Sequence, residues 1–225
     1  MRWIKGLVPT VIILLGALVL GCICYVSIWG APSFVVQRVE QALMEKGIPV
    51  HIETLKISLW PRAVVTLKNV ELLDPGVPPE ARRPVALLHE ADVALNWKEL
   101  IDGQVVPERL NVKGLDVNLP VDAEKPERVF STAGLNAELD LGRPGMVDIV
   151  KADAVVQGIS VTAQGAFSIG QEDSGDFTLT AEDMAAVREQ LNQVLKYLDR
   201  VKWPEASPPS LAVNLSDDPK GGVRV

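Results

Sequence analysis

Few side chains in this sequence have the chemistry to hold a metal ion. His51 and Glu53 lie two residues apart, which places both on one face of a strand and offers two metal ligands. The chain has only one other histidine, and its two cysteines, Cys22 and Cys24, fall inside a hydrophobic stretch. Two isolated ligands make a weak site, so we expect neither a metal nor a cofactor.

Residues suited to catalysis are equally sparse. His89 falls in the apolar phase of its segment, which predicts a hydrogen-bonded interior histidine rather than a general base. The sequence contains no G-x-S-x-G, P-loop, G-x-G-x-x-G or H-E-x-x-H motif. Asn214-Leu215-Ser216 matches a glycosylation sequon, a pattern short enough to arise by chance. We expect no catalytic residue; a hydrolase would require a charged cluster that these residues do not supply.

The elements that would position any site begin with a hydrophobic N-terminus. No charged residue lies between Lys5 and Arg38, and Leu7 to Trp29 is long enough to cross the roughly 30 Å hydrocarbon core as a helix. Arg2 and Lys5 precede this stretch, so the positive-inside rule predicts a cytoplasmic N-terminus and a body on the other side of the membrane. We predict a single-pass membrane anchor.

Two alternatives to a permanent anchor remain. A cleaved signal peptide would also begin with basic residues, but this apolar core is long and lacks a clear small-x-small cleavage site. Val19-Leu20-Gly21-Cys22 resembles a lipoprotein box with Cys22 as the lipidated residue, although the residues after it stay apolar.

Charge excludes one class of partner. The chain carries 22 basic and 29 acidic side chains, and removing Arg2 and Lys5 leaves 20 basic side chains against 29 acidic ones in the exported body. Such an acidic body is not expected to bind nucleic acid.

The body is predicted to consist of strands. Apolar residues alternate with polar ones over residues 85–97 and 129–141, which is typical of antiparallel strands with one wet face. The alternation changes phase at Gly114 and at Gly158, where β-bulges would restore the facing. With further strands near Val50–Leu59, Val64–Leu73, Phe177–Thr180 and Leu211–Leu215, we expect about nine strands in a curled antiparallel sheet.

Two amphipathic helices are expected beside the sheet. The first runs from about Ser33 to Lys46 and ends at Gly47. The second begins after Thr180, which Asp183 complements as a capping box, and continues until Pro204. Its apolar stripe predicts packing on the apolar face of the sheet, with a partner-binding or membrane-surface helix as the alternative. The stripe comprises Met184, Val187, Leu191, Val194, Leu195 and Leu198.

The order of these parts resembles a known family. After the apolar stretch and the short helix come His51-Ile-Glu-Thr-Leu-Lys-Ile-Ser-Leu-Trp-Pro-Arg62, Val65-Thr-Leu-Lys-Asn-Val-Glu-Leu-Leu-Asp74, Ala91-Asp-Val-Ala-Leu-Asn-Trp-Lys-Glu-Leu-Ile-Asp-Gly103 and Leu110-Asn-Val-Lys-Gly-Leu-Asp-Val-Asn-Leu119. This pattern is similar to the N-terminal region of the AsmA-like envelope proteins, which include TamB and YhdP and are similar to chorein-type lipid-transfer proteins. The resemblance covers about Leu7 to Pro120.

The resemblance implies a groove-like sheet, anchored in the bacterial inner membrane with a periplasmic body, that carries phospholipid and contributes to outer-membrane biogenesis. Family members are often longer, so the chain is either the start of a longer protein or a short relative that acts with partners. The alternative is a non-enzymatic envelope scaffold or interaction protein. The candidate groove residues are Val93, Leu95, Leu115, Val117, Leu119, Leu135, Ala137 and Leu139.

The expected organisation is therefore mainly β with one transmembrane helix. Residues 1–30 form the cytoplasmic tip and anchor, 31–49 a juxtamembrane helix, 50–180 the sheet, 181–203 an amphipathic helix and 204–225 a C-terminal strand and tail.

Overall fold

The computed structural model describes residues 30–59, 61–75, 77–78, 80, 82–122, 125, 127–168, 180–200, 209–217 and 223–224. The predicted membrane span at Leu7 to Trp29 lies outside these residues, as do residues 177–179 of one predicted strand. Among the residues that are described, no helix combines the length and the apolar character needed to cross a membrane.

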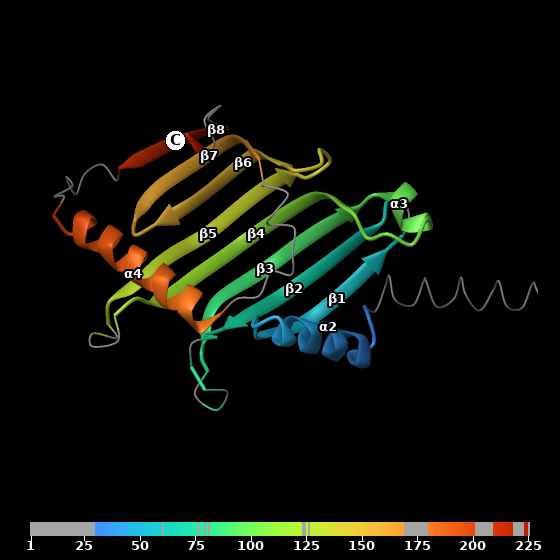
Figure 1. Cartoon of the computed structure of the whole chain (residues 1–225), viewed down its shortest axis with the longest axis horizontal. Helices are drawn as coiled ribbons and strands as arrows, with labels where there is room; N and C mark the ends of the chain where they lie inside the picture. Colours follow the sequence, from blue (N-terminus) through green and yellow to red (C-terminus); the bar gives the residue numbers. More distant parts are fainter. Residues whose placement is uncertain are drawn as a thin grey trace, which may run out of the picture.

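The described chain is mainly β and is built on one open sheet whose strands follow one another in sequence order (Figure 1). The strands are β1 (Val50–Ser58), β2 (Val64–Leu73), β3 (Pro84–Leu95), β4 (Pro107–Pro120), β5 (Val129–Asp140), β6 (Met146–Val156), β7 (Ile159–Ser168) and β8 (Ser210–Asp217). A two-residue strand, β9 (Val223–Arg224), pairs with the end of β8.

The prediction of an antiparallel sheet is wrong at the β7–β8 pair. Strands β1 to β7 form an antiparallel meander, but β8 lies parallel to β7, so the sheet is mixed. A parallel neighbour requires a long crossover connection, and helix α4 (Ala181–Leu198) lies within the connection between β7 and β8. The alternation of apolar and polar residues within a strand does not show whether its neighbour runs parallel or antiparallel to it.

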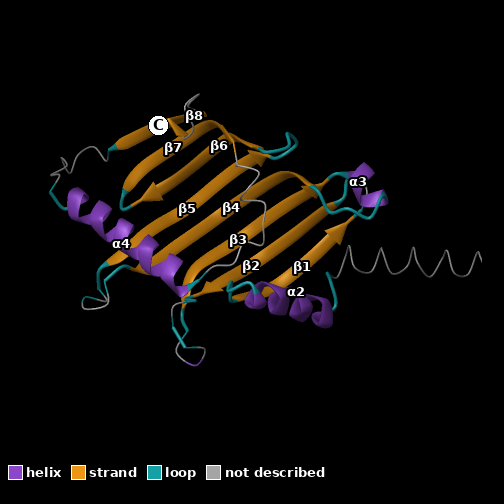
Figure 2. Cartoon of the chain, viewed as in Figure 1, coloured by secondary structure: helices purple, strands orange, loops and turns teal. Residues whose placement is uncertain are grey.

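Helix α2 (Ser33–Glu45) confirms the first predicted helix and lies beside β1 (Figure 2). Its Glu40 carboxylate accepts a hydrogen bond from the Ile52 backbone N–H at 2.7 Å. Just before the helix, the Ala31 N–H donates to the Leu55 carbonyl at 2.6 Å. These contacts satisfy polar groups on the outer edge of β1, an edge that would otherwise be open to pairing with another chain.

Helix α4 confirms the second predicted helix and its capping box between Thr180 and Asp183. The helix ends at Leu198, before the predicted end at residue 203, and residues 201–208 lie outside the described part of the chain. A short helix that the sequence analysis did not predict, α3 (Trp97–Ile101), follows β3 and is capped by the Asn96 side chain.

The predicted packing of α4 on the sheet is confirmed. Met184 is buried against Val85 and Leu119, with Leu72, Val117 and Leu191 packed around them. The helix is also held by two ion pairs, from Arg188 to Asp74 and from Arg128 to Asp199, so it crosses the ends of the strands (Figure 1). The stripe is only partly covered, because Val187 and Val194 remain exposed.

The predicted bulge at Gly114 is confirmed and is one of two facing bulges. In β4, Lys113 and Gly114 oppose the single residue Asn136, whose side-chain oxygen accepts from the Gly114 N–H at 3.0 Å. In β5, Ala133 and Gly134 oppose Asp116, whose carboxylate accepts from the Gly134 N–H at 2.7 Å. Both glycines have positive φ, 65° and 60°, as bulges of this kind require.

The prediction of a bulge at Gly158 is wrong. Gln157 and Gly158 form the turn between β6 and β7, with φ of 50° and 80°. Positive φ at both central residues is the geometry of a two-residue hairpin turn. A turn and a bulge both change which alternate positions of the chain are apolar, so the sequence pattern did not distinguish a turn at Gly158 from a bulge.

Replacing Gly114 with alanine should destabilise the fold more than replacing Gly134. Both substitutions put a side chain at positive φ, which costs about 1 kcal/mol. A Cβ at Gly114 would also lie 2.8 Å from the His89 ring, whereas at Gly134 it meets nothing within 4 Å. Denaturant unfolding of the full chain should show a free energy of unfolding that is lower by roughly a further 1 kcal/mol for Gly114→Ala. The contact with the His89 ring is unimportant for stability if the two variants have the same free energy of unfolding, or if adding His89→Ala does not restore stability to Gly114→Ala.

Candidate functional site

One face of the sheet is lined by rows of apolar side chains that run across the strands. Residues directly opposite each other in neighbouring strands share a face, so the strand register defines each row. Row 1 comprises Ile57, Val65, Val93, Leu110, Leu139 and Ile149. Row 2 comprises Leu55, Leu67, Ala91, Val112, Ala137, Ala152 and Ala163. We call these rows, together with row 3 below, the apolar face.

A third row continues this face on the far side of the bulges. Row 3 comprises Ile52, Val70, Leu88, Leu115 and Leu135. Leu135, Ala137 and Leu139 are alternate residues of β5 and therefore point to the same face. They belong to rows 3, 2 and 1 in turn, so all three rows lie on one side of the sheet. In β1 to β4 the members of rows 2 and 3 are three residues apart, so the alternation changes phase between the two rows in all four strands. Positive φ at Asn69 in β2 and at Gly114 in β4 marks this change.

Most side chains of the apolar face are only half-buried. Ile52, Leu55 and Ala91 are buried, and the remaining members of the three rows are intermediate. Helix α2 packs along β1 and α4 crosses one end of the strands, while α3 stands at the other end (Figure 2). Within the described residues, the buried helix-to-sheet cluster is confined to the α4 end.

The opposite face is charged over the same part of the sheet. Glu90 lies between Lys68 on β2 and Lys113 on β4, with N–O distances of 2.7 and 2.6 Å. Hydrogen bonds from Lys113 and then Lys68 lower the pKa of Glu90 from 4.5 to about 2. Glu90 in turn raises the pKa of Lys113. The sheet therefore has one apolar and one ionic side, as the alternation predicted.

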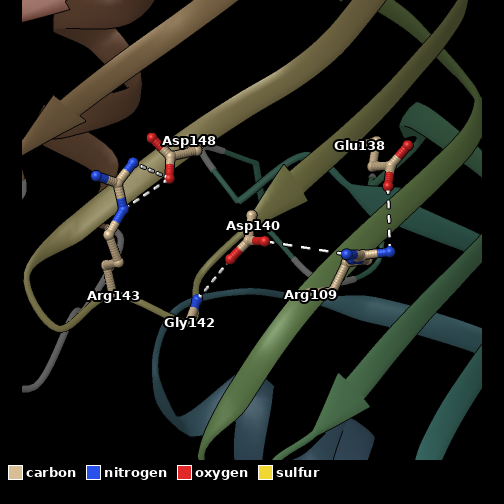
Figure 3. Close-up of polar contacts among 6 residues, drawn as sticks. All are labelled: Arg109, Glu138, Asp140, Gly142, Arg143 and Asp148. Atoms are coloured by element: carbon tan, nitrogen blue, oxygen red, sulfur yellow. Dashed lines mark hydrogen bonds and ion pairs between the residues drawn. The ribbon is translucent and has the colours of Figure 1, made fainter.

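A cleft of about 500 Å³ opens near α3, between the ends of β3, β4 and β5. Its lining includes Arg62, Trp97, Lys98, Arg109 and Asp140. Figure 3 shows that Arg109 is paired with Glu138 and Asp140, at 3.4 and 4.0 Å. Arg109 is thus shared by two carboxylates, so the cleft resembles a structural ion-pair network more than an acid–base pair.

A second network stands beside it on the turn into β6. Arg143 pairs with Asp148, and the Gly142 N–H donates to Asp140 at 2.9 Å (Figure 3). The Asp148 carboxylate raises the pKa of Arg143. In the part of the chain that is described, no group of three or more His, Cys, Asp or Glu side chains is arranged to hold a metal ion.

The two candidate metal ligands, His51 and Glu53, do not form a site together. His51 Nδ1 lies 3.1 Å from Glu40, whereas Glu53 accepts a hydrogen bond from Asn69, so His51 and Glu53 have different partners.

The prediction of an interior His89 is wrong, since its side chain is 53% exposed and lies 3.4 Å from Asp116. His89 sits beside the Gly114 bulge, where the apolar phase changes, so alternation assigned it to the wrong side.

The eight candidate groove residues fall into two environments. Val93, Leu115, Leu135, Ala137 and Leu139 belong to the three rows and are half-buried. Leu95 lies at the end of β3 next to the cleft, while Val117 and Leu119 are packed under α4. The structure therefore places five of the eight on the part of the face that α4 does not cover.

Several members of the apolar face were not singled out from the sequence. They include Leu55, Leu67 and Val112 of row 2 and Leu110 of row 1, whose strands were predicted but whose rows were not. Their alternation was visible, but only the strand register shows that they continue the rows of β3 and β5.

No protein-family model, curated protein or solved structure matches this chain.

The Glu90 cluster makes stability depend on pH in the acid range. The pKa of folded Glu90 is about 2, below the ordinary 4.5, so its ion pairs stabilise the fold above pH 4.5 and are lost as the pH falls towards 2. Glu90→Gln should therefore lower the free energy of unfolding near neutral pH and weaken its decline under acid. Denaturant unfolding at a series of pH values measures this, with Glu189→Gln on α4 as the control. Parallel pH profiles for wild type and Glu90→Gln would contradict the prediction.

Proposed function

We propose that the chain is a membrane-anchored lipid-binding module of the bacterial envelope, in which the apolar face solvates acyl chains. The observation that carries this proposal is the set of half-buried apolar rows, which cross the strands without a described layer over their middle. An apolar surface of this extent favours an apolar occupant, because each buried methylene group contributes about 0.8 kcal/mol. The charged opposite face is suited to water.

The dimensions of the sheet suit a phospholipid. Eight strands at about 4.8 Å spacing span roughly 34 Å across the strands. One leaflet contributes about half of a 30 Å hydrocarbon core, so an acyl chain needs roughly 15 Å. Acyl chains lying along rows 1 and 2 would therefore contact several strands at once. Binding of this kind requires no catalytic residue, and we assign none.

A second candidate function is an envelope scaffold that binds a protein at the sheet edge. Strand β8 is the last long strand of the sheet, β9 pairs only with its residues Ser216 and Asp217, and its Leu211 is 53% exposed. An outer strand of this kind can accept a strand from another chain. The α2 helix protects the opposite edge at β1, so β8 is the edge that this alternative would use.

Photo-crosslinking in bacteria tests the lipid proposal on the full chain. Benzoylphenylalanine at Val112 or Ala137 points to the apolar face, and at the adjacent Asn111 or Glu138 it points to the charged face. In cells grown with ³²P-phosphate, we expect a radiolabelled phospholipid adduct at Val112 and Ala137 and little at the two control positions. Equal labelling at all four positions would mean only that the protein is near a membrane and would contradict the proposal.

The same experiment separates the two functions. A crosslinker at Leu211 that captures one defined protein, together with no lipid adduct at Val112, would favour the scaffold. Leu139→Asp should reduce the lipid adduct at Val112, which lies diagonally across the β4–β5 pair on the same face, because Leu139 pairs with Leu110 and Val112 with Ala137. Glu138→Asp, on the charged face, should leave the adduct unchanged.

A further inference from the structure

A compact tip at one end of the sheet exposes an unusual number of apolar side chains. We define the α3 tip as residues 96–106. Trp97 is 48% exposed, Ile101 73% and Val105 71%. With Val106, four of the twelve exposed large apolar residues in the described chain fall in this short segment. An apolar cluster of this kind on a surface usually marks a contact site.

The α3 tip has a defined shape. The Asn96 side chain caps α3, the Asn96 N–H donates to the Val106 carbonyl at 2.8 Å, and the Gln104 N–H donates to the Glu99 carbonyl at 2.8 Å. Trp97 and Ile101 are four residues apart on the helix and so lie on one side of it. Trp97 and Ile101 are therefore presented together, and the exposed Val105 and Val106 belong to the same hydrogen-bonded segment.

The position at which the N-terminal segment joins the body indicates what covers the tip. Ala31 is hydrogen-bonded to Leu55, and β1 ends three residues later at Ser58. Ser58 pairs with Val64, which pairs with Ala94 just before α3, so β1 ends at the same end of the sheet as the tip. At about 3.3 Å per residue, the join lies roughly 10 Å from that end. Residues 1–29, with their charge-free apolar run from Leu7 to Trp29, begin from this join.

We infer that the α3 tip inserts Trp97, Ile101 and Val105 into the headgroup–acyl boundary of the bilayer that holds residues 7–29. Tryptophan favours this boundary, and a partly inserted apolar surface reaches about 5–10 Å into it. The nearby charges are of both signs, with Arg62 and Lys98 beside Glu99 and Asp102. Insertion is therefore driven by apolar burial and depends little on anionic lipid or salt.

Docking would hold the end of row 1 against the bilayer. Val93 lies four residues before α3 and pairs with Leu110, so a lipid leaving the membrane would meet the apolar face there. This role rests on the proposed lipid binding, whereas the docking itself does not.

Depth-dependent quenching tests the docking on the full chain. With Cys22 and Cys24 replaced by serine, an environment-sensitive fluorophore is attached at Val105→Cys or, as the matched control, at Val155→Cys. Val155 is also an exposed valine but lies near the other end of β6, away from α3. The protein is reconstituted into phosphatidylethanolamine–phosphatidylglycerol vesicles that carry a nitroxide lipid.

We expect a blue-shifted emission and a quenching ratio roughly twofold higher at position 105 than at 155, retained at high salt, as interfacial insertion requires. Trp97→Ser with Ile101→Ser should abolish the difference while the protein still floats with the vesicles. Equal quenching at both positions, or a blue shift without nitroxide quenching, which a second copy of the chain would produce, overturns the docking. If the protein does not float with the vesicles, both the predicted membrane span and the docking are wrong. The photo-crosslinking test of lipid binding is unaffected by that result.

Discussion

The paired bulges in β4 and β5 are the constraint on which the rest of the sheet depends. Side chains alternate with a period of two, so a shift of one residue moves every later side chain to the other face. Lys113–Gly114 and Ala133–Gly134 each insert one residue, and the Asn136 and Asp116 side chains accept the two glycine N–H groups. Because these polar groups remain bonded, the bulges are stable features, and row 3 stays on the same face as rows 1 and 2.

A single sheet organised in this way has little interior. Its buried helix-to-sheet cluster is built around Val85, Leu119 and Met184, where α4 crosses the strand ends. Elsewhere the described sheet is stabilised by strand pairing and by cross-strand ion pairs such as those of Glu90. Most side chains of the apolar rows are therefore not buried in a conventional core. This is the physical reason to propose a lipid for the apolar face and a bilayer surface for the α3 tip.

The successes and failures of the sequence predictions have distinct physical causes. Strand β2 and the capping box at Thr180 follow from local rules, namely alternation and side-chain capping, and both are present. Helix α3 was missed because five residues are too few to show a helical period, although Asn96 followed by Glu99 was a usable capping signal. His89 was misassigned because its facing depends on the bulge in the neighbouring strand, which alternation within β3 does not report.

The sequence by itself determined most of the strand segments, helices α2 and α4, the apolar side of the strands and the acidic character of the body, since these properties depend on residues near in the chain. The tertiary structure decided the parallel pairing of β8, the exposure of His89, the burial of Val117 and Leu119 under α4, and the alignment of residues from seven strands into row 2. These features depend on register and on contacts between residues far apart in sequence, which no local pattern encodes.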